Sequence, residues 1–316
     1  MGGARMARAG RLRSVLSSGG FAVTAEVTPP LAATAEALLA KSAPVASLVD
    51  AVNVTDAAGA RVAMSSFAAA AILAANGVEP ILQIACRDRN RIALAGDLLG
   101  AAAQGVHNLL ILHGDDPAGG DEPDATPVHD LDSRTVMGLA RRMRDEGTVP
   151  SGREIDGPPA FLIGAADTPR DPEPGWQPHG LAAKIEAGAD FAQTQFCFDL
   201  GVARRYLACL TDAGITERLS ILIGVGPVPS ARSAHWMREN LFGVSVPDHV
   251  IARLEGAKDQ RAEGERICIE MIQGLRDIPG VAGVHLMAPR VKMETVARII
   301  EESGLRGGGG RAATGS

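Results

Sequence analysis

Residues 108–117 read Asn-Leu-Leu-Ile-Leu-His-Gly-Asp-Asp-Pro, an apolar run followed at once by polar residues. The run predicts a short strand buried on both faces, as in a parallel sheet. Gly114 and Pro117 should end the strand, because glycine allows a sharp turn and proline cannot continue a ladder. Active sites of α/β folds are built at the carboxyl ends of such strands. Taken alone, however, the stretch is more typical of an ordinary acidic loop before a helix.

The unit of a short apolar strand and a helix recurs along the chain. Apolar runs predict strands at residues 21–27, 50–54, 80–85, 108–112, 159–165, 191–195, 219–225 and 281–286. Helical patterns occupy residues 33–43, 63–75, 91–103, 134–146, 181–187, 200–213, 233–240, 246–254, 260–275 and 291–303. Pro44 should end the first of these helices. The strict alternation predicts a single-domain α/β fold, a closed (β/α)8 TIM barrel.

An open, doubly wound sheet is the alternative architecture. Such sheets usually carry a GxGxxG turn directly after the first strand. In this chain Thr28-Pro29-Pro30 stands at that place. The barrel is therefore the favoured interpretation.

Composition limits the classes of function. The chain has 316 residues, of which 46% are hydrophobic, and a formal net charge of −6, so neither nucleic acid nor an anionic membrane is expected as partner. Residues 67–75 form the longest strongly apolar stretch, which is too short to span a bilayer. The four cysteines are far apart, which favours a reducing cytosol and a cytoplasmic protein. The seven histidines form no HxH or HExxH pattern, so no metal site is expected.

Three segments are expected from the distribution of residues. Residues 1–20 form a basic lead-in segment with four arginines and no acid, and we expect a helix at 5–17. Residues 21–306 form the catalytic barrel. Residues 307–316 are rich in glycine and are expected to be a disordered tail.

The residues that follow the strands should share one rim of the barrel. They are Glu26, Thr28, Thr55, Asp56, Gln83, Arg87, His113, Asp115, Asp167, Thr194, Gln195, Pro227, Met287 and Arg290. Carboxylates and amides over one cavity are suited to moving protons and to holding a polar heterocycle. The rim is therefore the expected active site.

Glu26 is the sharpest candidate, because it lies near the end of an apolar strand, where an unpaired charge is costly. Burial there would favour the protonated acid and suit a general acid, although a glutamate paired with arginine or lysine is an equal alternative. Asp115 could stabilise a positive charge on a ligand or cap a helix. Gln195 could pair with a ring amide or face solvent. A catalytic thiol at Cys86 or Cys197 is a minor alternative, since no histidine lies close in sequence.

Several motifs together resemble the methylenetetrahydrofolate reductase family over residues 21–303. They are Ala-Glu-Val-Thr-Pro-Pro at 25–30, Val-Asn-Val-Thr-Asp at 52–56, Gly-Asp-Asp-Pro at 114–117, Lys-Ile-Glu-Ala-Gly-Ala-Asp-Phe at 184–191 and Thr-Gln-Phe at 194–196. Their order and spacing match the family pattern, although each motif alone is weak. The resemblance implies a (β/α)8 barrel that interconverts 5,10-methylenetetrahydrofolate and 5-methyltetrahydrofolate, with NADH or NADPH feeding a bound FAD.

The resemblance also implies roles for individual residues. Glu26 would be the general acid that opens the methylene bridge, and Asp115 would favour the cationic iminium. The folate substrate would be held by Gln195, Arg290 and Thr28. The flavin would be contacted by Thr55, Gln83, His113, Gly114, Asp115, Asp167 and Lys184. A cytoplasmic homo-oligomer in one-carbon metabolism and methionine biosynthesis is expected, with a redox partner subunit as a further option.

The chain departs from the family pattern at four places. The family usually has arginine at 113, histidine at 83 and phenylalanine near 231, where this chain has His113, Gln83 and Ala231. Residues 165–172 also lack the tyrosine and histidine of the family. Three of these places normally contact FAD, so the folate half of the site looks intact and the flavin half altered.

Three interpretations follow from these departures. The first is a reductase that still binds FAD, through backbone contacts and substitutes such as Arg87 or Arg170. The second is a variant without tightly bound flavin, or one that oxidises methyltetrahydrofolate in one-carbon catabolism. The third is a folate-binding or partner-dependent subunit without redox chemistry of its own. Retention of both Glu26 and Asp115 argues against the third.

Overall fold

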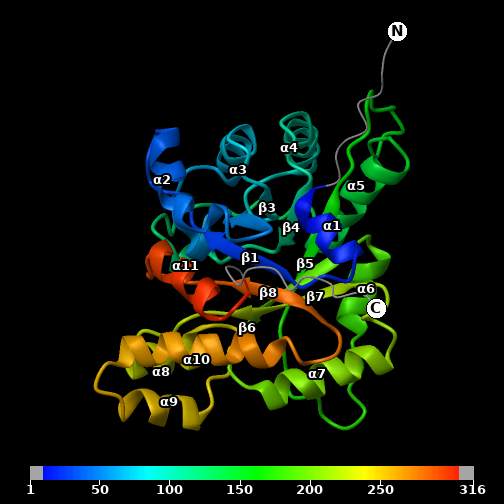
Figure 1. The fold of residues 1–316 in the computed structure, drawn as a ribbon. Helices are drawn as coiled ribbons and strands as arrows, with labels where there is room; N and C mark the ends of the chain where they lie inside the picture. The colour runs from blue at the N-terminus through cyan, green and yellow to red at the C-terminus, as the bar shows by residue number, and fades with distance from the viewer. Residues whose placement is uncertain (1–9, 306–316) are drawn as a thin grey trace, which may run out of the picture.

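Eight parallel strands close into a barrel in a computed structural model, which describes residues 10–305 of the chain (Figure 1). Each strand pairs with its neighbours in sequence, and β8 returns to pair with β1. The strands are β1 (Ala22–Val27), β2 (Ala51–Val54), β3 (Pro80–Ala85), β4 (Asn108–Leu112), β5 (Leu162–Asp167), β6 (Phe191–Phe196), β7 (Ser220–Val225) and β8 (Val281–Leu286). The predicted TIM-barrel fold is confirmed.

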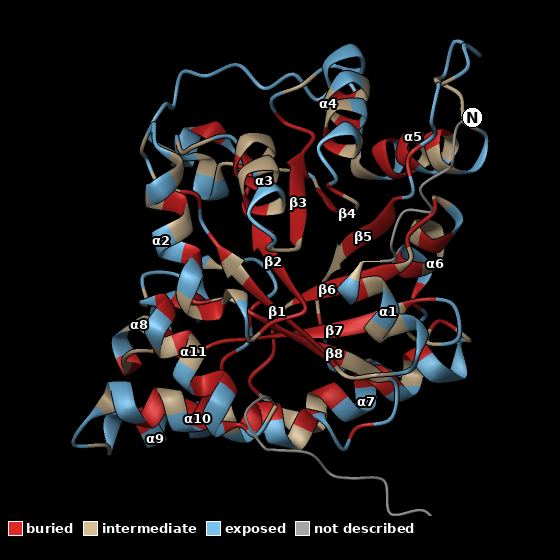
Figure 2. Cartoon of the chain, turned by 45° about the horizontal axis from the view of Figure 1, so that its top comes forward, coloured by how far each residue is buried: buried red, intermediate tan, exposed pale blue. Residues whose placement is uncertain are grey.

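Helices surround the barrel and bury their inner faces against it, while their outer faces stay exposed (Figure 2). The chain adds two helices, α8 and α9, between β7 and the helix α10. The helices are α1 (Arg11–Ser17), α2 (Ala35–Ala46), α3 (Ser66–Ala75), α4 (Arg91–Ala103), α5 (Ser133–Asp145), α6 (His179–Glu186), α7 (Leu200–Asp212), α8 (Ala231–Asn240), α9 (Asp248–Glu255), α10 (Gln260–Leu275) and α11 (Met293–Glu302). Short 3-10 turns η1 (Ala58–Ala60) and η2 (Pro117–Gly119) lie in the loops after β2 and β4.

The predicted boundaries of two elements were wrong. Pro44 lies inside α2 and does not end it, because the helix continues far enough to bury Val45 in the core. The fifth strand was predicted at 159–165 but runs from Leu162 to Asp167. Its start is fixed by pairing with β4, where Leu162 stands opposite Asn108. Partner strands therefore set this register, and the apolar run does not.

Helix α1 closes the amino-terminal end of the barrel. Leu12 is fully buried in a cluster with inward residues of the strands, among them Phe191 and Leu222. The backbone N–H groups of Arg11 and Leu12 donate to the Glu79 carboxylate, at 2.5 and 3.1 Å. The basic lead-in helix therefore packs on the barrel, although it begins only at Arg11. The rest of the predicted lead-in helix and the glycine-rich tail lie outside the described residues.

No helix within residues 10–305 is long and apolar enough to cross a membrane. This agrees with the short apolar stretch at 67–75, which forms most of α3.

Leu12 should be essential for closing the barrel. Replacing Leu12 with Ala leaves a cavity below the strands and should lower the free energy of unfolding by about 2–5 kcal/mol. Chemical denaturation measures this loss. Leu31 is 79% exposed, so Leu31→Ala is the matched control and should change stability by less than about 0.5 kcal/mol. Equal stability of the two variants would contradict this role of α1.

Candidate active site

A cavity of about 610 Å³ opens at the carboxyl ends of the strands. Its size is within the usual range for a site that takes one small ligand, about 300–1,000 Å³. The sequence-predicted residues in its wall are Glu26, Asp56, Gln83, His113, Gly114, Asp115, Asp167, Lys184, Thr194, Gln195 and Met287. The barrel thus gathers, at one rim, residues that are far apart in the chain.

Thr28, Thr55 and Arg290 do not belong to the wall of this cavity as the described chain forms it. Thr28 is exposed after β1, and Arg290 is exposed after β8 with a left-handed φ of 62°. Thr55 is buried, and its hydroxyl has no hydrogen-bond partner within residues 10–305. The structure therefore does not bring these three residues together with the other predicted site residues.

Glu26 stands at the end of β1 with a partly buried carboxylate. The amide nitrogen of Gln83, on β3, donates to Glu26 Oε2 at 3.0 Å. The Nε2 atom of His285, on β8, lies 3.8 Å from the same oxygen. Among the described residues, no arginine or lysine lies within ion-pair distance of Glu26. The alternative of a simple rim ion pair therefore has no support in the geometry.

His285 was missed by sequence reasoning, and so was the buried network that holds it. The Gln193 amide nitrogen lies 2.9 Å from Thr24 Oγ1 and 3.1 Å from Asn53 Oδ1. The Asn53 amide donates back to Gln193 Oε1 at 2.6 Å. Thr24 Oγ1 in turn lies 3.0 Å from His285 Nδ1. These four side chains come from β6, β1, β2 and β8 and link the strands across the barrel interior.

The network fixes the position of the His285 ring. Its Nδ1 lies 3.0 Å from Thr24 Oγ1 and 3.3 Å from the Gln193 amide nitrogen. The Thr24 hydroxyl also lies 3.4 Å from the Val284 carbonyl oxygen, to which it can donate its one proton. The Nε2 side of the ring faces Glu26. The ring is 2% exposed, so its orientation is fixed by the barrel and not by solvent.

Asp115 joins two loops at the rim. Its Oδ2 accepts a hydrogen bond of 2.6 Å from the backbone N–H of Gly59, in η1. Nearby, both carboxylate oxygens of Asp121 accept from the N–H of Val62, at 3.0 and 3.1 Å. A helix cap is indeed present in this loop, but Asp116 provides it through Ala118 N. Asp115 is thus left to fasten the two loops and to face the cavity.

The loop after β2 is strained where Asp115 and Asp121 hold it. Ala57 and Ala60 have left-handed φ angles of 48° and 52°, which cost energy in residues other than glycine. Gly120 packs directly against Ala60, and a β-carbon on residue 120 would be 2.0 Å from the Ala60 carbonyl oxygen. We call the paired loops 57–62 and 115–121 the rim clasp. The clasp keeps the Asp115 carboxylate at the cavity wall.

Asp167 and Lys184, which also line the cavity, already have protein partners. The Tyr206 hydroxyl donates to Asp167, and burial raises the pKa of Tyr206 far above its usual range. Lys184 Nζ donates to the Ala166 carbonyl oxygen at 2.6 Å and lies 3.8 Å from Asp167. The imidazole of His113 stacks on His129 with ring centroids 4.4 Å apart. These groups are engaged within the chain itself.

Arg87 is also occupied. It is 3% exposed and donates to the Asp88 carboxylate at 2.6 and 2.7 Å and to the Asp115 carbonyl oxygen at 2.9 Å. Its role is to hold the long loop after β4, and it does not line the cavity. Gln195 does line the cavity, and its Oε1 accepts from Phe196 N at 3.0 Å. This leaves the Gln195 amide nitrogen as the part of that side chain available to a ligand.

The thiols and the metal-binding groups offer no second chemistry. Burial raises the pKa of Cys86 and of Cys197 to about 11, so both thiols are protonated at neutral pH. Within residues 10–305, no cluster of three metal-ligating side chains occurs.

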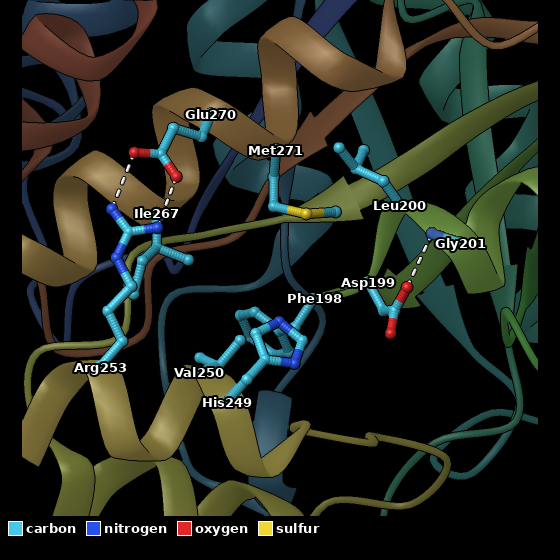
Figure 3. A pocket seen from close by; sticks show the side chains of 10 residues that line it. All are labelled: Phe198, Asp199, Leu200, Gly201, His249, Val250, Arg253, Ile267, Glu270 and Met271. Carbon is cyan, nitrogen blue, oxygen red and sulfur yellow. Dashed lines mark hydrogen bonds and ion pairs between the residues drawn. The ribbon is translucent and has the colours of Figure 1, made fainter.

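A second cavity, of about 250 Å³, lies between α7, α9 and α10 (Figure 3). Most of its charged groups already have partners within the chain. Asp199 caps α7 through the N–H of Gly201 at 2.7 Å, and Arg253 pairs with Glu270 at 2.5 and 2.7 Å. His249 is the remaining polar side chain of its wall. The cavity at the barrel rim is larger and holds the sequence-predicted residues, so it is the candidate active site.

The family model described as methylenetetrahydrofolate reductase matches residues 11–304. The chain belongs to the methylenetetrahydrofolate reductase family. It is 28% identical over 235 residues to a probable methylenetetrahydrofolate reductase (NADPH) of Caenorhabditis elegans, covering 72% of this chain and 32% of that protein. It is 24% identical over 202 residues to the 5,10-methylenetetrahydrofolate reductase of Salmonella typhimurium, covering 62% and 61%. The chain thus spans about a third of the first family member and under two thirds of the second.

Solved structures show the same fold at low identity. A protein of Clostridium thermocellum, described as binding two copies of 5-methyl-5,6,7,8-tetrahydrofolic acid, superposes with a TM-score of 0.67 at 13% identity and covers 93% of this chain and 98% of its own. DmoA of Hyphomicrobium sulfonivorans gives 0.52 at 12% identity, covering 89% and 86%. At these identities the likeness concerns the fold alone.

The rim clasp should loosen when Asp121 is replaced. Asp121→Ala removes the acceptor of the Val62 N–H, so the amides of residues 59–62 should exchange hydrogen several-fold faster, as expected for the loss of about 1 kcal/mol. Hydrogen exchange read by NMR or mass spectrometry measures this. Asp124→Ala, in the same exposed loop, is the control and should leave the exchange rates unchanged. Unchanged rates in both variants would show that Asp121 does not hold the loop.

Proposed function

We propose that the chain interconverts 5,10-methylenetetrahydrofolate and 5-methyltetrahydrofolate, with NADH or NADPH as the electron source. Membership in the family supports this reaction. The observation that carries the proposal is the Glu26 carboxylate, which accepts a hydrogen bond from Gln83 and lies 3.8 Å from His285 in the wall of the cavity. The structural relative described as binding methyltetrahydrofolate is consistent with a folate ligand in such a barrel.

Glu26 is placed to act as the general acid. Reduction of the methylene bridge begins when a bridging nitrogen takes a proton and its bond to the methylene carbon breaks. Glu26 is partly exposed at the cavity and accepts a hydrogen bond from Gln83, with His285 Nε2 3.8 Å away, so its carboxyl group can exchange protons with both a ligand and solvent. The Gln83 amide then stabilises the carboxylate that remains.

Asp115 would stabilise the product of that ring opening. Bond breaking leaves a cationic iminium, in which the methylene carbon is electron-poor. A carboxylate at the cavity wall favours this cation, and the Gly59 N–H keeps the Asp115 side chain in place. Hydride from the dihydronicotinamide then adds to the methylene carbon and gives the methyl group. The electrons and the proton balance with one nicotinamide oxidised per methyl group formed.

The amide side chains on β6 provide the means to hold a pterin ring. Gln193 and Gln195 both line the cavity, as expected for residues two positions apart on one strand. The pairing of β6 with β7 shifts register between Gln193 and Phe196, so the strand is bulged there. The Gln195 amide nitrogen can donate to a ring carbonyl or nitrogen. We propose that Gln195 binds the pterin while Gln193 keeps the buried network in place.

The residues of the cavity do not fit FAD as a resident cofactor. The wall carries four carboxylates, from Glu26, Asp56, Asp115 and Asp167. Asp56 pairs with Arg89 and Asp167 lies 3.8 Å from Lys184, which leaves Glu26 and Asp115 without an arginine or lysine partner in residues 10–305, against Arg170 alone. A diphosphate bound there would meet acidic groups where arginine, lysine or free N–H donors are needed. Lys184, Asp167 and His113 are also engaged by protein partners. We therefore derive no step through a flavin. A nicotinamide co-substrate needs to place only its ring in the cavity, with its phosphates outside.

Glu26→Gln tests the general acid. The amide keeps the shape of the side chain but cannot supply the proton, so turnover should fall by about 10²- to 10⁴-fold. Affinity for 5-methyltetrahydrofolate should change by less than about threefold, because a neutral hydrogen-bonding group remains. Steady-state kinetics and a binding titration measure the two quantities.

The titration separates the proposal from its main alternative, a folate-binding subunit without redox chemistry. Wild-type protein that binds 5-methyltetrahydrofolate but never oxidises NADH or NADPH with the methylene substrate would support the binding subunit. Gln104→Ala, at the end of α4 and far from the rim in the fold, is the control and should leave turnover unchanged.

The absorption spectrum tests the cofactor. Purified protein, before and after addition of excess FAD and gel filtration, should show no flavin band, because the acidic wall rejects the diphosphate. Turnover with NADH or NADPH should also be independent of added FAD. A retained flavin band together with FAD-dependent turnover would overturn the direct transfer of hydride from nicotinamide.

A further inference from the structure

Phe242 is the most exposed large apolar side chain of the described residues and also lines the cavity. It is 91% exposed, in the loop between α8 and α9. The chain is poor in aromatic residues, at 3%, and most of its phenylalanines are in the core. The exposed phenyl ring of Phe242 lacks the stabilisation that burial gives to the other phenylalanines. A ligand that covers the ring would remove its apolar surface from water and so provide that stabilisation.

The position of Phe242 is fixed by its neighbours in sequence. Val244 is buried and Leu241 partly buried in the cluster around α8 and α9. Gly243 has a left-handed φ of 73°, and a β-carbon there would lie 2.4 Å from Thr168 Cγ2. Glycine is therefore needed both for the turn and for the contact with Thr168. The phenyl ring is presented by an anchored turn that touches the loop after β5.

Arg170 lies two residues beyond Thr168 and lines the same cavity. Its guanidinium lies 5.4 Å from the ring centroid of Trp176, a cation–π contact that orients it. Among residues 10–305, no carboxylate lies within ion-pair distance of Arg170, whereas Lys184 is already engaged. The mouth thus combines an uncovered aromatic ring with a cation that lacks an anion.

We propose that Phe242 and Arg170 bind the p-aminobenzoylglutamate tail of the folate, an inference that rests on the proposed function. The polar network at Gln193, His285 and Gln83 is 2–4% exposed and lies at the floor of the cavity, where the pterin belongs. The tail leaves the pterin outward, as an aromatic ring followed within a few bonds by carboxylates. This sequence of groups matches a phenyl ring followed by a guanidinium.

The proposed tail site lies away from the last strand of the barrel. Arg290, which the family resemblance gave as a folate contact, is exposed after β8 and does not line the cavity. Ala231, at the position of the family phenylalanine, is buried at the start of α8. Phe242 and Arg170 instead come from the loops after α8 and after β5. The folate therefore lies across the β5 side of the rim in this chain.

Two ligands separate the contributions of the ring and the cation. 5-Methyltetrahydrofolate carries the glutamate, and 5-methyltetrahydropteroate lacks it. Phe242→Ala should weaken both ligands about tenfold, whereas Phe242→Tyr should stay within about twofold of wild type. Arg170→Gln should weaken 5-methyltetrahydrofolate about tenfold and leave 5-methyltetrahydropteroate unchanged. Equilibrium titration of the full chain measures each dissociation constant.

An exposed aromatic residue and an exposed arginine outside the cavity serve as matched controls. Trp236 is a half-exposed aromatic residue on α8 outside the cavity, and Arg134 is an exposed arginine on α5. Trp236→Ala and Arg134→Gln should leave both dissociation constants unchanged. A raised KM for NADH or NADPH in Phe242→Ala or Arg170→Gln, with unchanged folate affinity, would assign the mouth to the nicotinamide dinucleotide and overturn the proposal.

Measurements on the wild-type protein separate an incorrect tail site from an incorrect proposed function. Wild-type protein that neither binds 5-methyltetrahydrofolate nor reduces the methylene compound would contradict the proposed function. Wild-type protein that does both, with Phe242→Ala and Arg170→Gln binding both ligands as tightly as wild type, would overturn only the tail assignment.

Discussion

The side-chain amide of Gln193 is the constraint on which the active end of the barrel depends. It is 3% exposed and would cost stability if any of its polar atoms lacked a partner. Asn53 and Thr24 satisfy it, and Thr24 in turn contacts His285. Because these partners come from β2, β1 and β8, a slip of any of these strands by one residue would break the network. The same bonds that pin the register therefore aim His285 at Glu26.

The two ends of the barrel are built from different chemistry. At the amino-terminal end, Leu12 and the inward strand residues form an apolar plug. The Phe191 ring packs directly against Gly164, and a β-carbon on Gly164 would be 2.4 Å from Phe191 Cζ. The side chains at this end of the barrel therefore leave no space between the strands. The polar network begins directly above these side chains. A ligand can thus enter only from the carboxyl end, where the network gives it donors and acceptors in fixed positions.

The positions of most strands and helices depend on short stretches of sequence and could therefore be predicted. Apolar runs ended by glycine or proline located the strands, and the position of Glu26 near the end of such a run placed it at the cavity wall, as predicted. Pro44 and the start of β5 were misjudged because burial of Val45 and pairing with Asn108 decided them. Both are long-range effects that no window of sequence contains.

The buried half of the site was missed for the same reason. Gln193 and Gln195 look alike in the stretch Phe-Ala-Gln-Thr-Gln-Phe, and both line the cavity, but only Gln193 is enclosed by the buried network of Thr24 and Asn53. His285 reads as one polar residue in an apolar strand, with a satisfied core histidine as the ordinary interpretation. A signal was present nonetheless, since Thr24, Asn53, Gln193 and His285 are all polar residues inside predicted buried strands. Such residues need one another, because burial leaves them no water.

The division between strands and loops explains how the chain can keep one half of a family site and change the other. Glu26, Gln83 and His285 are on strands, where every substitution also disturbs the packing of the barrel. His113, Arg170 and Phe242 are on loops, which can change without cost to the core. Under the proposed function, proton transfer to the folate would thus be tied to the fold, whereas contacts to the electron donor and to the folate tail would not. Such a barrel could exchange its electron donor while the proposed acid, Glu26, stays in place.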